Sequence, residues 1–271
     1  QREARPTIAN YERRPAPLTL QQPLSVKGSM ERTQVAPDLR LELFAAEPDI
    51  AKPIFMAWDE RGRLWIAETR DYPHNVKPDG MGNDSIKICE DTNGDGRADK
   101  FTVFADKLNI PTGFVFTHGG IVVAQPPRFL FLKDTNGDDQ ADERKEIMTG
   151  WGVNDTHAQA NNLHYGHDNW LYNASYKWRW RPDATGPWRR EPVPAVGQWG
   201  ITQDDFGRRF YTSNSDQLRG DFLPSHYAGG LDPRLSLYGI RFQVATDQST
   251  WPVRPTPGVN RGYTKDQLRD D

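Results

Sequence analysis

The sequence predicts an all-β fold, and three observations lead to this prediction. Glycine (23) and proline (21) are frequent, and aromatic residues make up 11% of the 271 residues. From Leu39 onward the chain contains short apolar alternations such as Leu41 to Phe44. Segments that look like hairpins then recur along the chain. This combination favours strands and turns over helices.

The first 38 residues differ from the rest of the chain. They are rich in proline and charge, and they show no sustained apolar periodicity. Such a composition predicts an extended arm over residues 1–38. We expect the folded domain to span residues 39–271.

Four segments share one pattern: an apolar strand, a polar turn rich in Asp, Gly or His, and a second strand with aromatic residues. They cover residues 56–68, 115–125, 163–175 and 201–213. Hairpins at unequal intervals of this size are typical of propeller blades with loop insertions. The sequence therefore predicts a β-propeller of about four blades, and a β-sandwich of similar hairpins is the alternative.

Four blades are few for a closed ring of the usual six-bladed type. We therefore expect an incomplete propeller, which is completed by further residues of a longer natural chain or by another chain. The chain opens at Gln1 without an initiator Met. We therefore expect an upstream segment that was either removed or lies outside this sequence.

Charge and hydropathy exclude two classes of partner. The formal net charge is -3 and the pI is near 6.1, so the chain lacks the basic excess that binding to nucleic acid needs. The mean hydropathy is -0.80, and the longest aliphatic run covers only residues 121–124, so we expect no transmembrane segment. Cys89 is the one cysteine, so no intrachain disulfide can form.

Two segments match the first part of a calcium-binding loop. Oxygen-bearing side chains at positions 1, 3, 5 and 9, with a backbone carbonyl at position 7, aim at one centre in a tight turn. Position 12 is Thr or Lys in place of Glu, and Asp139 replaces the glycine of the sharp turn in the second loop. The alternative is a pair of metal-free Asx turns. The predicted calcium ligands are Asp91, Asn93, Asp95, Arg97 (carbonyl) and Asp99, and Asp134, Asn136, Asp138, Gln140 (carbonyl) and Asp142.

Three histidines, His157, His164 and His167, lie in the richest polar patch of the chain. His164 and His167 flank a predicted turn, which makes a shared metal site less favoured than a solvated turn. His157 lies in a polar loop just before a strand, where propeller loops project toward the central axis. An imidazole there can act as a general base near neutral pH.

A loop stiffened by proline follows near the end of the chain, at residues 251–263. It carries Arg254, Asn260 and Arg261, and planar cations held in this way suit carboxylate binding. The alternative is a structural linker whose arginines pair with a neighbouring blade.

Several stretches together resemble the β-propeller domains of bacterial membrane-bound dehydrogenases and PVC-type haem-binding proteins. The resemblance runs from about residue 39 to the end, through LELFAAEPDIAKPIFMAWDERGRLWIAET, ICEDTNGDGRADKFTVFAD, DTHAQANNLHYGHDNWLYNAS and WPVRPTPGVNRGY. These domains are distantly similar to soluble PQQ-dependent sugar dehydrogenases. The resemblance implies a large exported protein, often with a c-type cytochrome domain.

The same resemblance implies roles for individual residues. His157 matches the base that takes a substrate hydroxyl proton, and Arg254, Asn260 and Arg261 are the candidates for holding the quinone carboxylates. The chain departs from the pattern in two ways, because GHDN replaces the commoner GPDG and no CxxCH motif is present. Any haem c therefore belongs to a region outside these residues or to a partner.

Two functions follow from these observations. The first is a propeller domain of an exported, periplasmic or cell-surface oxidoreductase of the PQQ type, which acts on a sugar or alcohol and passes electrons to a c-type cytochrome. The second is a non-catalytic propeller, either a scaffold or a carbohydrate-binding module in a larger assembly.

Overall fold

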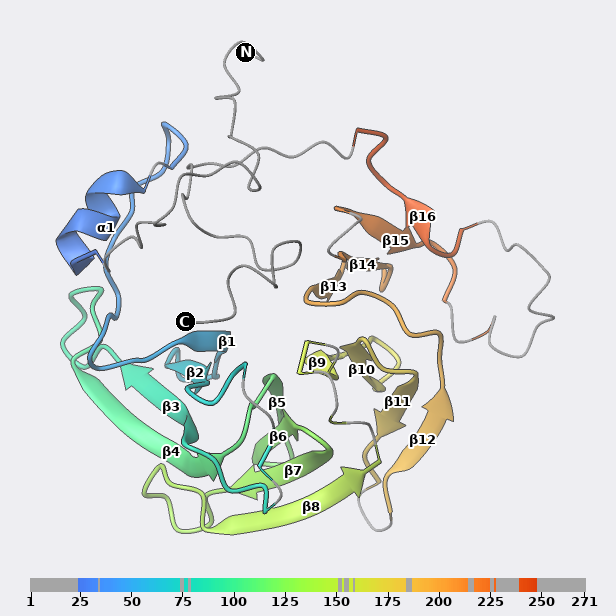
Figure 1. The fold of residues 1–271 in the computed structure, drawn as a ribbon, viewed down its shortest axis with the longest axis horizontal. Coiled ribbons are helices and arrows are strands. Elements are labelled where there is room, and N and C mark those ends of the chain that lie inside the picture. Colours follow the sequence, from blue (N-terminus) through green and yellow to red (C-terminus); the bar gives the residue numbers. More distant parts are fainter. Residues whose placement is uncertain are drawn as a thin grey trace, which may run out of the picture. The chain divides into compact units, whose positions relative to one another are not determined.

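We analysed a computed structural model of the chain (Figure 1). It describes residues 24–33, 35–73, 76–77, 79–150, 153, 156–157, 159–183, 187–213, 217–224, 227 and 239–247. Glu42–Gln248 form one compact unit, and the residues before and after it group separately. Among the described residues no helix is long and apolar enough to span a membrane.

The described residues of the compact unit form four antiparallel sheets of four strands each, and each sheet follows the order of the chain. Successive sheets are the blades of a β-propeller, and their first strands lie innermost (Figure 1). The predicted all-β propeller fold is confirmed. Blade 1 contains β1 (Pro53–Trp58), β2 (Leu64–Glu68), β3 (Asp84–Glu90) and β4 (Lys100–Leu108); blade 2 contains β5 (Gly113–Thr117), β6 (Gly120–Gln125), β7 (Arg128–Lys133) and β8 (Glu143–Thr149). Blade 3 contains β9 (Asn161–Tyr165), β10 (Leu171–Ala174), β11 (Trp178–Arg181) and β12 (Arg189–Pro192); blade 4 contains β13 (Ile201–Gln203), β14 (Arg209–Tyr211), β15 (Arg219–Asp221) and β16 (Phe242–Gln243).

The two largest core clusters lie between neighbouring blades, because both faces of blade 2 pack against its neighbours. Strand β6 shows the principle, since successive side chains of a strand point to opposite faces. Ile121 and Val123 belong to the cluster shared with blade 1, whereas Val122 and Ala124 belong to the cluster shared with blade 3. A strand that is buried on both faces is expected to contain a continuous run of apolar residues. Residues 121–124 form such a run.

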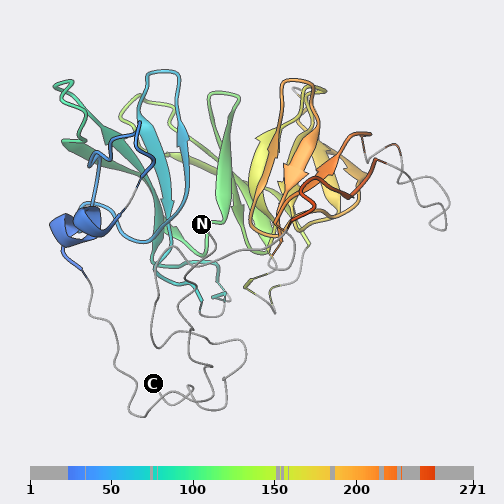
Figure 2. The ribbon, with the colours of Figure 1, turned by 90° about the horizontal axis from the view of Figure 1, so that it is seen from above.

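The first hairpin of blade 1, of blade 3 and of blade 4 closes with the same kind of five-residue turn. In each turn the fourth residue has a positive φ: 77° for Gly62, 61° for Asn169 and 76° for Gly207. Its N–H donates to the carbonyl of the first residue at 2.9–3.0 Å. The equivalent first positions are therefore Asp59, Gly166 and Asp204. Figure 2 shows the turns of blades 1, 2 and 4 at one end of the sheets.

The described part of residues 1–38 contains one element that the predicted extended arm does not include, and residues 1–23 lie outside the described residues. Val26–Arg32 form a short helix, α1, instead of an extended segment. The local reasons are the absence of proline in this stretch and the Ser25 hydroxyl, which accepts the Gly28 N–H at 3.1 Å as an N-cap.

Candidate functional site

The polar loops at the starts of the inner strands form the candidate site. They lie at the opposite end of the blades from the hairpin turns. The side chain at the start of one inner strand donates to the chain entering the next blade: Asn161 Nδ2 donates to the Gln198 carbonyl at 2.6 Å, and the Thr112 hydroxyl donates to the Ala160 carbonyl. Thr112 is 2% exposed and Asn161 is fully buried, so these bonds fix the loops relative to one another.

His157 lies in the loop that enters blade 3, and its side chain is exposed. Two other loops hold this segment. The Tyr72 ring meets the imidazole edge-on with centroids 5.5 Å apart, and the Trp199 indole N–H donates to the His157 carbonyl at 2.9 Å. The neighbouring Thr156 hydroxyl donates to the Pro73 carbonyl at 3.3 Å. The imidazole is therefore presented to solvent on a braced loop.

The β2–β3 loop, which carries Tyr72, is itself held by a buried polar network. Asn109 Nδ2 donates to Asp71 Oδ2 at 3.0 Å, and Gln125 Nε2 donates to the Gly80 carbonyl at 3.1 Å. Burial alone would raise the pKa of Asp71, but hydrogen bonds from Asn83 and Asn109 outweigh it and hold the pKa below its usual range. Gly82 is required here, because a Cβ would lie 2.1 Å from the Leu108 carbonyl oxygen. The sequence does not predict this network, because its members come from the β2–β3 loop, the β4–β5 loop and β6, which are separate along the chain.

Asp84 anchors the same region from the start of β3. Its carboxylate accepts the N–H groups of Arg70 (2.5 Å), Asp71 (3.0 Å) and Ile110 (2.6 Å). Ile110 has a φ of 52°, a left-handed conformation that a β-branched residue rarely adopts. The bond to Asp84 helps to offset that strain, and it ties the entrance of blade 2 to blade 1.

The two predicted calcium loops have the same internal geometry. Asp91 Oδ2 accepts the Gly96 N–H at 2.7 Å, and Asp134 Oδ2 accepts the Asp139 N–H at 2.8 Å. The hydrogen bond from Gly96 leads the effects that lower the pKa of Asp91. Among the described residues no group of three His, Cys, Asp or Glu side chains converges on one centre. In this geometry the carboxylates bind backbone N–H groups as Asx turns, and calcium binding stays a prediction.

Asp139 explains why the second loop lacks the expected glycine. It adopts a φ of 64°, close to the 86° of Gly96 at the equivalent position. Its carboxylate accepts from Arg63 Nη1 at 2.9 Å, and Arg63 Nε also donates to Asp59 at 2.8 Å. The strained aspartate thus links the loop of blade 2 to the hairpin turn of blade 1.

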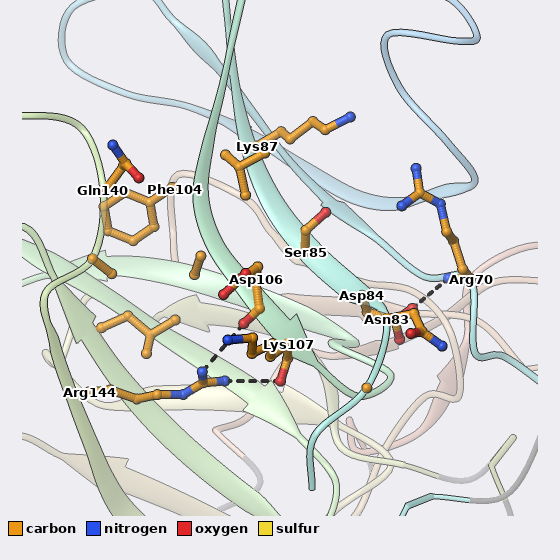
Figure 3. A pocket seen from close by; sticks show the side chains of 15 residues that line it. Arg70, Asn83, Asp84, Ser85, Lys87, Phe104, Asp106, Lys107, Gln140 and Arg144 are labelled. Atoms are coloured by element: carbon orange, nitrogen blue, oxygen red, sulfur yellow. Dashed lines mark hydrogen bonds between the residues drawn. The ribbon is translucent and has the colours of Figure 1, made fainter.

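A cavity of about 760 Å³ lies beside β3, β4 and the start of β8 (Figure 3). Two of the cations that line it have structural partners: Lys87 pairs with Glu68 at 3.1 Å, and Arg144 donates to the carbonyls of Asp106 and Lys107 at 3.3 and 3.4 Å. A second cavity of about 500 Å³ lies at the hairpin end between blades 1 and 2, beside His118. Of the predicted site residues, Gln140 lines the first cavity and Asp134 lines the second cavity, whereas His157 lines neither of these two cavities.

The predicted quinone ligands Arg254, Asn260 and Arg261 lie outside the described residues. A tricarboxylate in this site needs paired cations, because burying unpaired charge is costly. In the described part of the β2–β3 loop, Lys77 already lies 3.6 Å from Asp71. The assignment of Arg254, Asn260 and Arg261 as quinone ligands therefore stays a prediction.

Solved structures with some likeness to this chain include three enzymes. A gluconolactonase from Xanthomonas campestris is 18% identical, with 60% of this chain and 54% of that chain covered and a TM-score of 0.43. The PQQ domain of pyranose dehydrogenase from Coprinopsis cinerea is 15% identical (59% and 43% covered, TM-score 0.39), and virginiamycin B lyase from Staphylococcus aureus is 14% identical (66% and 58% covered, TM-score 0.39). The chain thus spans about half the length of these proteins.

The comparison with curated proteins gives no match. The comparison with protein families does, and it covers most of the chain. Residues 25–269 match a family described as a domain of unknown function, DUF7133. The match includes every blade of the propeller and the loop that carries His157, and the chain therefore belongs to the DUF7133 family.

Proposed function

We propose that this chain is the propeller domain of a dehydrogenase that acts on a hydroxyl group of a sugar or alcohol, with His157 as the general base. The observation that carries the proposal is the exposed imidazole of His157, which is held at the loop end of the blades by Tyr72 and Trp199. A base must be accessible to substrate and fixed in direction, and this arrangement supports both.

In the proposed reaction an imidazole nitrogen of His157 accepts the hydroxyl proton while the carbinol carbon is oxidised. A quinone of the PQQ type, when bound, supplies the acceptor chemistry for that oxidation. The residues of this chain bind and orient the substrate, and the Tyr72 ring limits rotation of the imidazole. The arginines at 254 and 261, with Asn260, are the proposed ligands of the quinone.

The proposal also covers calcium binding, the cellular location of the protein and its electron acceptor. Exposed loops with several carboxylates, such as those at Asp91 and Asp134, suit the weak calcium binding of extracellular modules. We place the protein in the periplasm or at the cell surface, with a c-type cytochrome domain or protein as the electron acceptor. Haem c belongs to that partner or to a region outside these residues.

The test is turnover of the purified protein, supplied with PQQ, calcium and an artificial electron acceptor, on a panel of sugars and alcohols. We expect His157→Gln to lower kcat by about 10²–10⁴-fold, the usual loss for a general base, without a change in the thermal midpoint. His118→Gln is the matched control, because His118 is also exposed but lies at the opposite, hairpin end of blade 2. Unchanged turnover in His157→Gln would refute the proposed base. Lack of turnover by the wild-type protein on the whole panel would favour a non-catalytic module.

A further inference from the structure

Two aromatic side chains from different blades lie beside His157. Tyr72 comes from the β2–β3 loop of blade 1, and Trp199 comes from the loop that enters blade 4. Tyr72 is half-buried and meets the imidazole edge-on. Trp199 is 37% exposed, and its N–H is used by the His157 carbonyl. Part of the Trp199 surface therefore stays open to solvent next to His157.

The Trp199 side chain is held on a rigid backbone. The preceding residue, Gln198, donates its N–H to the Thr212 carbonyl at 2.9 Å, and its own carbonyl accepts from Asn161 Nδ2 (2.6 Å) and the Ser175 hydroxyl (3.1 Å). These bonds tie the loop to blades 3 and 4. An exposed aromatic side chain on an anchored loop loses little conformational entropy when it binds a ligand.

We propose that Trp199 and Tyr72 form an aromatic platform that binds the ring of a cyclic sugar beside His157 and selects it over open-chain polyols. The face of an aromatic ring carries partial negative charge, which attracts the partially positive C–H groups on one face of a pyranose. An open-chain polyol presents no such flat face and must lose several rotational freedoms to imitate one. The platform thus determines specificity, and the inference rests on the proposed site at His157.

The experiment measures binding apart from turnover. Saturation-transfer NMR, with irradiation of the protein's aromatic protons, is recorded for methyl glycosides of common aldopyranoses and for the matching alditols, such as D-glucitol. We expect transfer to the ring C–H protons of at least one pyranoside and weaker transfer to its alditol. Trp199→Leu should weaken binding of that pyranoside about tenfold, whereas Trp199→Phe, which keeps a ring, should weaken it less.

Phe206→Leu is the matched control, because Phe206 is 84% exposed in blade 4 but lies in the β13–β14 turn at the hairpin end. It should leave pyranoside binding unchanged, and thermal midpoints confirm that each variant is folded. Equal binding of pyranoside and alditol, no transfer to any pyranoside, or undiminished binding in folded Trp199→Leu would each overturn the platform.

These experiments also distinguish failure of the aromatic platform from failure of His157 as the proposed base. If pyranoside binding depends on Trp199 while turnover is insensitive to His157→Gln, the platform stands and the proposed base fails. If turnover depends on His157 but Trp199→Leu binds pyranosides as the wild type does, the base stands and the platform fails.

Discussion

The imidazole of His164 in blade 3 is half-buried, and its Nε2 atom is buried. Its Nδ1 lies 3.3 Å from the Asn162 carbonyl, and the ring stacks on Tyr172 with centroids 5.8 Å apart. Burial lowers the pKa of His164 below its usual 6.5, and Arg209 adds to this effect, while the Asn162 carbonyl and Asp168 oppose it. The folded state thus favours the neutral imidazole.

This shift predicts a pH dependence of stability. Between the usual pKa of 6.5 and the lower folded value, the unfolded state binds more protons, so the free energy of unfolding falls as the pH falls through that window. Above about pH 7.5 the contribution is constant, because the imidazole is then neutral in both states. We expect His164→Gln to flatten the decline, measured by urea unfolding from pH 8 to pH 5. Parallel curves for the variant and the wild type would contradict this assignment.

The guanidinium of Arg63 links blades 1 and 2 by an ion pair. Its side chain is 12% exposed and meets Asp59, Asp139 and Glu90 at 2.8, 2.9 and 3.8 Å. Burial opposes the charge, but hydrogen bonds to Asp139 and Asp59 prevail and raise the pKa of Arg63. The residue therefore stays charged at all ordinary pH values.

Removing this guanidinium leaves partly buried carboxylates without their partner. We expect Arg63→Met to lower the free energy of unfolding by about 2–3 kcal/mol, because Asp139 and Asp59 lose charge-assisted hydrogen bonds. Arg61→Met, an exposed neighbour in the same turn, should change it by no more than about 0.5 kcal/mol. Similar losses in both variants, measured by chemical unfolding, would show that the pairing contributes little.

At the scale of elements, the aspartate loops of blades 1 and 2 carry the calcium prediction. If the loop at Asp91 binds calcium, Asp95→Ala should lower the thermal midpoint in calcium and have little effect in chelator. Ligand binding stabilises the folded state by about 2.7 kcal/mol when the ligand is present at a hundredfold of Kd. Equal losses in both buffers, followed by thermal unfolding, would favour the metal-free Asx turn, which Asp95 also supports by accepting the Arg97 N–H at 2.9 Å.

At the scale of the whole molecule, the two faces of blade 1 differ in what covers them. Phe114 of blade 2 is 1% exposed and packs its ring on Phe55 of blade 1, with centroids 5.0 Å apart. On the opposite face of β1, Met56 is 67% exposed and Trp58 is 55% exposed. Phe44 packs on Trp58 there, with ring centroids 5.5 Å apart, and Ala45 and Ile50 cover the same face of β2. We propose that a further blade of a completed ring, from a longer chain or from another chain, packs on the part of this face that stays exposed.

A pair of core and surface variants tests this difference. Phe114→Ala should lower the free energy of unfolding by about 3–5 kcal/mol, as expected for a large side chain lost from a core. Met56→Ala should change it by no more than about 0.5 kcal/mol in this chain by itself. A large loss for Met56→Ala, measured by urea unfolding, would mean that this face is covered in solution.

The sequence by itself determined the all-β class, the propeller and the hairpins, because these depend on local patterns. The run at residues 121–124 and the polar turns at Asp59 and His118 are visible in the chain without any contact information. The exact positions of the turns could not be predicted in the same way: in blades 3 and 4 the turns begin at Gly166 and Asp204, so His167 and Asp205 are their second positions. The register depends on which residue takes the positive φ, and neither composition nor polarity reveals that.

The tertiary structure alone decided which distant residues meet. His157 could be predicted as a candidate from its place before a strand, but not its neighbours Tyr72 and Trp199, which are far from it in the chain and come from other blades. Asp139 departs from the glycine of the calcium-loop pattern, and only the structure gives the reason, because its partner Arg63 of blade 1 lies 2.9 Å away. The physical reason is the same in both cases. Local sequence sets backbone conformation within a blade, whereas contacts between blades depend on how the sheets pack around the axis.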